Sequence, residues 1–203
     1  MLVHYFLENS AKRLPDKTAL IFQNQRLTYK QIDEGANQLA HALIRAGFKR
    51  GDRVSIFLDN SSEAIIALFG TLKAGGVFST LSATLKSKKL HYILNNSESS
   101  FLISQWQKNE IISKAVENAR SLKAVIMCGK VKSKSHSTNT NIIEWDTFIN
   151  SQPNSKPEIQ CIDVDLANII YTSGSTGNPK GVMMTHLNMA TAATSITQYL
   201  ENC

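Results

Sequence analysis

The chain has 203 residues, of which 42% are hydrophobic and 19% are charged, values close to those of ordinary globular proteins. This composition excludes a disordered chain, and ten glycines with four prolines exclude a collagen-like or linker protein. The length suffices for one sizeable domain or two small ones. The three cysteines, Cys128, Cys161 and Cys203, form no C-x-x-C pair, so neither a disulfide framework nor a zinc site is predicted.

The net charge of +6 invites comparison with nucleic-acid-binding proteins. The densest basic cluster is Lys123, Lys130, Lys132 and Lys134, which runs into a polar Ser/Thr/Asn stretch. A short basic run of this kind is typical of a solvated loop, and a phosphate-backbone patch is the alternative. Because few aromatic residues accompany the basic ones, we expect no nucleic-acid partner.

The sequence gives no sign of a membrane segment. The N-terminus carries Glu8 and Lys12 and lacks the apolar core of a signal peptide. The longest apolar stretch, Ala64 to Gly70, falls far short of the roughly 20 residues that span a bilayer. We therefore expect no membrane span and a cytoplasmic location.

Strand-like and helix-like runs alternate through the first 81 residues. Thr28, with Gln31 three positions later, predicts a capping box at the start of a helix that ends at Gly47. Asn60, which Glu63 follows three positions later, is predicted as the N-cap of a second helix. That helix is apolar on nearly every face, so we expect it to be packed between layers of the fold and not to lie on the surface. Strands are predicted over 18–23, 53–58 and 77–81, and helices over 29–44 and 64–73.

The same alternation continues in the second half and predicts an α/β fold with a mainly parallel layered sheet and crossover helices. A long surface loop is expected over 129–141 and an extended connector over 151–160. The segment 166–172 is predicted as the last strand, and a helix capped by Thr185 is expected to follow its loop. The remaining predictions are helices over 85–95, 108–120 and 144–149 and strands over 101–104 and 124–127.

The loop from Thr172 to Gly181 carries four hydroxyls, three glycines and one lysine. Glycine allows close backbone approach to an anion, and hydroxyls and Lys180 add donors and positive charge. The segment therefore predicts a polyphosphate cradle, with a Ser/Gly linker as the alternative. It is not a Walker A loop, because Pro179 and Gly181 flank Lys180 where that pattern requires Gly and Ser or Thr.

The histidines and tryptophans carry weaker predictions. His186 follows Thr185 and is expected in the first turn of a helix. The other histidines show no metal-ligand spacing, so we expect surface or hydrogen-bonded side chains and no metal site. Trp106 and Trp145 are expected to pack rather than to stack on a ligand. These other histidines are His4, His41, His91 and His136.

The stretch Tyr171 to Val182 closely resembles the phosphate-loop motif of the adenylate-forming superfamily, which includes acyl-CoA synthetases and adenylation domains of nonribosomal peptide synthetases. Leu27-Thr28-Tyr29 with Asn37 and Ala40 is similar to the first core motif of that family. Leu72 to Gly76 is similar to the second, and Gly51-Asp52-Arg53-Val54 lies between them. The resemblance follows the family from its N-terminus and covers essentially the whole chain.

This resemblance implies a two-step reaction. A small-molecule carboxylate attacks the α-phosphate of Mg·ATP to give an acyl-adenylate and pyrophosphate, and coenzyme A or a carrier-protein pantetheine then takes the acyl group. It also implies that His186 lines the acyl or nucleotide site. The residues implied to hold the β- and γ-phosphates are Thr172, Ser173, Gly174, Ser175, Thr176, Gly177 and Lys180.

Two departures from the family pattern bear on these expectations. Val77-Phe78-Ser79-Thr80 replaces a run that usually contains Val-Pro, which puts the strand geometry there in question. By this resemblance, we expect residues 1–203 to be the N-terminal portion of an AMP-binding domain, truncated after the phosphate loop, without the adenine, magnesium and hinge segments and the catalytic lysine. We therefore expect no complete catalytic set and no ATP–pyrophosphate exchange by this chain alone.

The resemblance leaves three alternatives for the role of the chain. The first is the N-terminal part of an acyl-CoA ligase, favoured by Val182 to Asn188. The second is part of an adenylation domain that loads a carrier protein. The third is a non-catalytic gene fragment, or a module that works with a separate C-terminal chain or self-associates through exposed apolar surface.

Overall fold

The computed structural model describes residues 1–129, 140–172 and 177–200. Within these residues a seven-stranded sheet has the order β7-β6-β5-β3-β4-β8-β9. All neighbouring strands are parallel except β8 and β9, which are antiparallel. The strands are β3 Arg53–Phe57, β4 Val77–Thr80, β5 Ser99–Gln105, β6 Ala124–Cys128, β7 Ile142–Glu144, β8 Leu166–Thr172 and β9 Lys180–Thr185. The predicted mainly parallel α/β sheet is confirmed.

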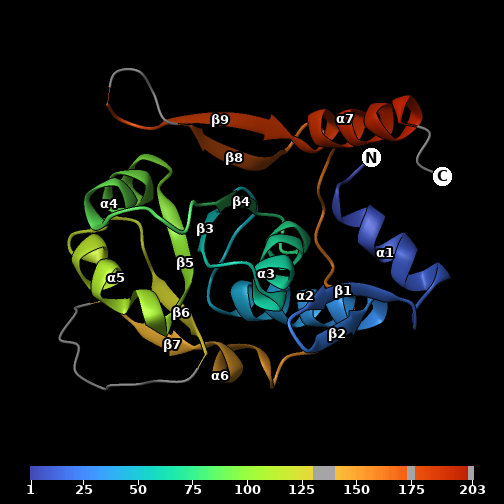
Figure 1. Cartoon of the computed structure of the whole chain (residues 1–203), viewed down its shortest axis with the longest axis horizontal. Coiled ribbons are helices and arrows are strands. Elements are labelled where there is room, and N and C mark those ends of the chain that lie inside the picture. Colours follow the sequence, from blue (N-terminus) through green and yellow to red (C-terminus); the bar gives the residue numbers. More distant parts are fainter. Residues whose placement is uncertain (130–139, 173–176, 201–203) are drawn as a thin grey trace.

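Helices cover both faces of this sheet (Figure 1). One apolar cluster joins alternate strand residues such as Val54 to α2, α3 and α6, and the other joins residues such as Phe57 to α4 and α5. A strand that is buried on both faces of a sheet must be apolar along nearly its whole length, and the strand sequences here meet this requirement. The helices are α1 His4–Arg13, α2 Tyr29–Arg45, α3 Ser62–Lys73, α4 Ser87–Asn96, α5 Asn109–Val116, α6 Trp145–Ile149 and α7 His186–Tyr199.

A separate antiparallel hairpin, β1 Thr18–Phe22 and β2 Gln25–Thr28, lies beside α2 (Figure 1). Gln23 takes a positive φ of 51° in its turn. Among the described residues, no helix is both long and apolar enough to cross a membrane. The predicted loop at 129–141 mostly falls outside the described residues, and Lys130, Lys132 and Lys134 lie there.

Several local predictions are confirmed and others are wrong. The Thr28–Gln31 capping box forms at the start of α2, and Gly47 ends that helix with a φ of 81°. The N-cap of α3 is Ser61, whose Oγ accepts from the Ala64 amide, and not Asn60. The elements α1, β7 and β9 form where no helix or strand was predicted.

Lys73 of the second family-like motif is a buried cation that joins three helices. Its side chain is 1% exposed, and its Nζ lies 2.7 Å from Oδ1 of both Asp33 and Asn37 on α2. Glu8 of α1 approaches the same Nζ to 3.4 Å. Since an unpaired buried charge is costly, this motif lysine is explained by helix packing rather than by contact with a ligand.

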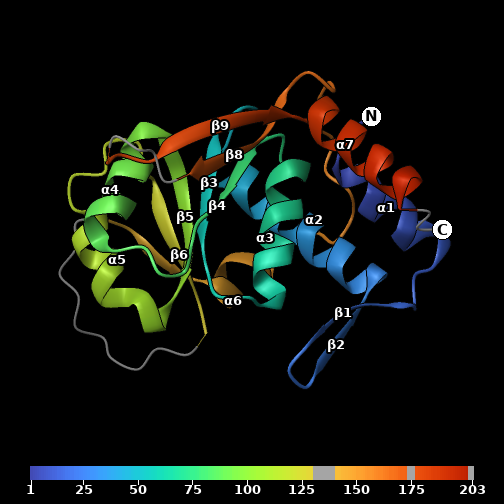
Figure 2. The same ribbon diagram turned by 45° about the horizontal axis from the view of Figure 1, so that its top comes forward.

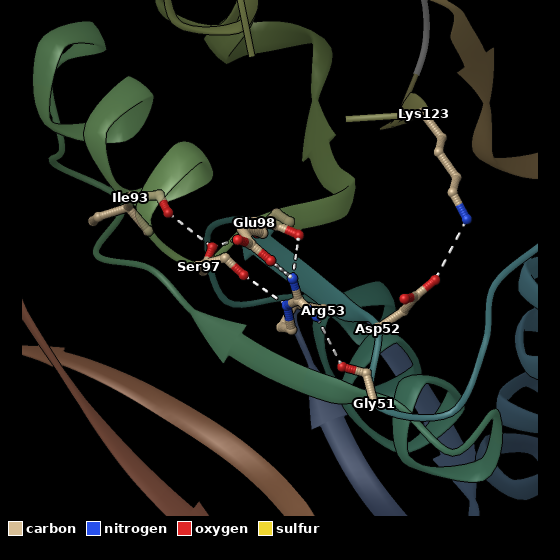
Figure 3. A network of polar contacts seen from close by, with 8 residues as sticks. Gly51, Asp52, Arg53, Ile93, Ser97, Glu98 and Lys123 are labelled. Atoms are coloured by element: carbon tan, nitrogen blue, oxygen red, sulfur yellow. Dashed lines mark hydrogen bonds and ion pairs between the residues drawn. The ribbon is translucent and has the colours of Figure 1, made fainter. Parts of the chain in front are cut away.

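The Gly51-Asp52-Arg53 motif also has a structural role, at the edge of the sheet where β3 begins (Figure 3). The Arg53 guanidinium donates to the carbonyl oxygens of Ser97 at 2.6 Å and of Glu98 at 3.0 Å. It also pairs with the Glu98 carboxylate at 2.7 Å. Asp52 accepts from the Lys123 ammonium at 3.4 Å. The bonds of Arg53 hold the turn between α4 and β5 against the start of β3.

Replacing Arg53 tests whether its hydrogen bonds to the Ser97 and Glu98 carbonyls stabilise this turn. We expect Arg53→Met to lower the free energy of unfolding by about 2 kcal/mol, because bonds from a charged donor to backbone carbonyls are lost. The matched variant Glu98→Gln removes only the ion pair, whose carboxylate is 71% exposed. That variant should cost less than about 1 kcal/mol. Urea unfolding measures both, and equal losses would contradict the assignment.

Candidate functional site

The predicted phosphate loop connects the two strands of a β-hairpin. Strands β8 and β9 pair from Leu166↔Thr185 to Thr172↔Lys180. Thr172 and Lys180 are therefore direct cross-strand partners at the last rung before the loop. Figure 1 shows that this end of strands β8 and β9 is the one distant from α7. The antiparallel pairing thus brings a hydroxyl and a cation to the same end of the hairpin.

Three of the seven predicted phosphate-loop residues are described. Thr172, Gly177 and Lys180 are exposed, and Gly177 has a φ of 92°, a conformation that favours glycine. Lys180 forms no ion pair with any residue that the structure describes. Its charge is therefore available to a ligand. The other four, Ser173, Gly174, Ser175 and Thr176, lie outside the described residues.

The prediction that 166–172 is the last strand is wrong. The loop is followed by β9 and only then by α7, so the hairpin tip does not lie at a helix N-terminus. Loop amides, and not a helix dipole, must supply the backbone donors for an anion here. The short apolar run from Val182 to Met184, which ends at the β-branched Thr185, was the available signal for β9.

The hairpin joins the sheet through β4. Phe78 of β4 is the register partner of Asn168 in β8. Ser79 Oγ donates to the Ile169 carbonyl at 2.6 Å. Ser79 lies in the run that departs from the family pattern, and β4 nevertheless forms as a regular parallel strand. This departure therefore leaves the base of the hairpin in place.

Beyond β4 the hairpin extends over α4 (Figure 2). A pocket of about 780 Å³ separates its tip, Gly177 to Pro179, from that helix. Lys88 and Lys89 of α4 line the pocket, and its described lining contains no carboxylate. Together with Lys180, these lysines make the surroundings of the tip cationic, which favours an anionic ligand.

His186 lies at the other end of β9, as the first residue of α7. Its side chain is 1% exposed, and its Nδ1 accepts from the Val3 amide at 3.1 Å. Thr185 forms the predicted N-cap, with Asn188 completing a capping box. The first-turn prediction is confirmed. The contacts of His186 are with the N-terminal segment, and a role in lining the acyl or nucleotide site stays a prediction.

The expectation that the other histidines are exposed or hydrogen-bonded is wrong for His4. This residue is buried, its ring lies 5.7 Å from that of His186, and its Nδ1 has no hydrogen-bond partner in the described structure. Burial, followed by the charges of His186, Lys73 and Lys156, lowers the pKa of His4 to about 3. Burial also lowers the pKa of His186. Both rings are therefore neutral at pH 7.

The remaining side chains singled out by the sequence have packing or hydrogen-bonding contacts. His41 pairs with the Ser155 carbonyl at 2.9 Å and His91 with the Ala115 carbonyl at 2.8 Å. Trp106 and Trp145 pack against the two core clusters. His136 and Cys203 lie outside the described residues. Within the described residues, no group of three or more His, Cys, Asp or Glu side chains could hold a metal ion.

The fold and the loop-bearing hairpin place the chain in a known class of enzymes. The family model "AMP-binding enzyme" matches residues 7–203, and the chain belongs to this family. Bacitracin synthase 1 of Bacillus licheniformis is 35% identical over 92% of the chain. Tyrocidine synthase 1 of Brevibacillus parabrevis is 31% identical over 93% of the chain. The chain spans only 3% and 15% of these two proteins.

Solved structures show the same fold. The anthranilate CoA ligase AuaEII, in complex with anthranoyl-AMP, matches 92% of the chain with a TM-score of 0.84 and 25% identity. The N-terminal domain of FACL13 from Mycobacterium tuberculosis matches 91% with a TM-score of 0.76 and 27% identity. The chain spans 35% and 44% of these two structures. It therefore corresponds to about a third to a half of the solved relatives.

The neutral, buried His4 makes stability depend on pH. Its pKa is about 3 in the folded state and about 6.5 when unfolded. The unfolded chain therefore binds the extra proton between these values, so stability is complete above pH 6.5 and falls as the pH decreases. At pH 5 the loss should reach about 2 kcal/mol. Urea midpoints at pH 7.5 and 5.0 should differ less for His4→Leu, and an unchanged difference would contradict this assignment.

Proposed function

We propose that the chain contributes the polyphosphate-binding part of an enzyme that activates a small-molecule carboxylate with Mg·ATP. The observation that carries this proposal is the hairpin rung Thr172↔Lys180. There a lysine with no ion-pair partner among the described residues lies beside a sequence rich in glycine and hydroxyl groups. Membership of the AMP-binding family supports it. The complete reaction is proposed for the whole enzyme, because the chain spans only part of its relatives.

The chemistry of the hairpin fits a leaving pyrophosphate. ATP supplies the adenylyl group, and negative charge grows on the β- and γ-phosphates as the carboxylate attacks. Lys180 would neutralise part of that charge, while the Thr172 hydroxyl and the loop amides would donate hydrogen bonds. The positive φ of Gly177 helps a loop to turn its amides toward an anion. Ser173, Gly174, Ser175 and Thr176 are proposed to complete this cradle.

The acyl acceptor is proposed to be coenzyme A. The sequence from Val182 to Asn188 favours the acyl-CoA ligase type, and the solved relatives include an anthranilate CoA ligase. A specific observation favours a second candidate, because curated relatives above 30% identity include peptide synthases. In that case the acceptor would be a pantetheine on a carrier protein.

The chain is also proposed to need a further partner for activity. Strand β9 and helix α7 expose large apolar side chains, including Met183 at 66% and Tyr199 at 87%. An apolar surface of this kind marks an interaction site or promotes association. The partner would be the rest of the enzyme, a separate C-terminal chain or a second copy. A non-catalytic fragment with the same surface is the alternative.

Replacing Lys180 tests the polyphosphate proposal. We expect Lys180→Ala to weaken binding of Mg·pyrophosphate about 10-fold, since the lost charge-assisted contact contributes roughly 1.5 kcal/mol. Isothermal titration calorimetry on the whole chain measures the dissociation constant. Lys30→Ala is the matched control, because Lys30 is exposed on α2. If both variants bind as the wild type does, or if the wild type does not bind, the proposal fails.

Exposed apolar residues predict concentration-dependent association. Sedimentation velocity over a range of concentrations should detect oligomers of the wild type, and the double variant Met183→Gln/Ile196→Gln should shift the distribution toward monomer. Ile21→Gln is the matched control, because Ile21 is similarly exposed on the distant hairpin β1–β2. A purely monomeric wild type, or an equal response to the control, would count against an interface at β9 and α7.

A further inference from the structure

A tyrosine next to the phosphate loop joins the hairpin to α4. Tyr171 of β8 directly precedes Thr172. Its hydroxyl donates a hydrogen bond to Oδ1 of Asn96, the last residue of α4, at 2.7 Å. These residues are 75 positions apart in the sequence. The bond therefore connects the start of the loop to a helix on the body of the domain.

The local packing directs the tyrosine toward α4. The ring of Tyr171 is half-buried against the apolar cluster of α4, α5 and the strands β5 and β6. Gly181 is its cross-strand partner, and a Cβ at position 181 would lie 3.3 Å from Tyr171 Cζ and 2.9 Å from Ile169 Cγ2. Glycine at this position thus leaves room for the ring.

The hydroxyl remains a donor at neutral pH. Burial raises the pKa of Tyr171 above its ordinary value, so the phenol keeps its proton. Asn96 Oδ1 accepts a hydrogen bond from this phenol, and the length of 2.7 Å is ideal for two oxygens. The register between β4 and β8 pairs Phe78 with Asn168. The β4–β8 pairing therefore does not reach Tyr171, which lies three residues further along β8. The side-chain bond supplies a second attachment there.

We propose that Tyr171 and Asn96 are positioning residues, whose hydrogen bond holds the base of the phosphate loop over α4 and thereby sets the affinity for polyphosphate. The inference rests on the proposed function for its effect on binding. The positioning itself is independent of any ligand. Without the bond, the hairpin samples more orientations, and a ligand must restrict them when it binds.

Hydrogen–deuterium exchange of the whole chain tests the positioning directly. Tyr171→Phe and Asn96→Ala should each accelerate exchange of the amides from Gly177 to Val182, with no change in α2. Since both variants remove the same bond, the double variant should exchange no faster than either one. Tyr29→Phe on α2 is the matched control. Wild-type exchange in both single variants, or additive effects in the double variant, would overturn the inference.

Calorimetry with Mg·pyrophosphate then tests the effect on affinity. Each single variant should raise the dissociation constant about fivefold, which corresponds to one ordinary hydrogen bond, while the thermal midpoint stays within error of the wild type. Unchanged dissociation constants would overturn the proposed effect on affinity. If the wild type itself does not bind pyrophosphate, the proposed function fails, and the exchange measurement still decides whether Tyr171 and Asn96 position the hairpin.

Discussion

The junction between β4 and β8 is the constraint on which the position of the candidate site depends. Here a parallel sheet buried on both faces accepts an antiparallel hairpin at its edge. Phe78 pairs with Asn168, and Ser79 donates to the Ile169 carbonyl. The β4–β8 ladder stops at this point, while β8 and β9 continue together to Thr172↔Lys180. The hairpin therefore extends past β4 and carries this pair beyond it.

Most of the family-like motifs in this chain contribute packing and not ligand contacts. Thr28 caps α2, Lys73 neutralises carboxylates between α1, α2 and α3, and Arg53 holds the turn before β5. Each polar group is occupied by protein partners. Lys180 differs, because it is exposed and has no ion pair among the described residues. This contrast separates the residues that build the domain from those free to bind an anion.

The two ends of the hairpin also differ in their surroundings. At the α7 end, His186 is buried beside His4 and accepts from the Val3 amide, which attaches the N-terminal segment to the end of β9. At the loop end, Tyr171 and Asn96 make a solvent-exposed contact. Exposed contacts of this kind break more readily than buried ones. The hairpin is therefore attached through a buried contact at its α7 end and through an exposed one at its loop end.

The sequence by itself determined the features that depend on neighbouring residues. Apolar strands, the Thr28 and Thr185 caps and the stop at Gly47 follow from local periodicity and hydrogen bonding, and the resemblance around the loop indicated the family. Tertiary structure decided the rest. β9 becomes a strand because it pairs with β8. His4 is buried because α1 packs against α2 and α3 and its ring meets that of His186. Tyr171 meets Asn96 only because the hairpin crosses α4. The contacts of His4 with His186 and of Tyr171 with Asn96 join residues far apart in the chain, so no local pattern could have predicted them.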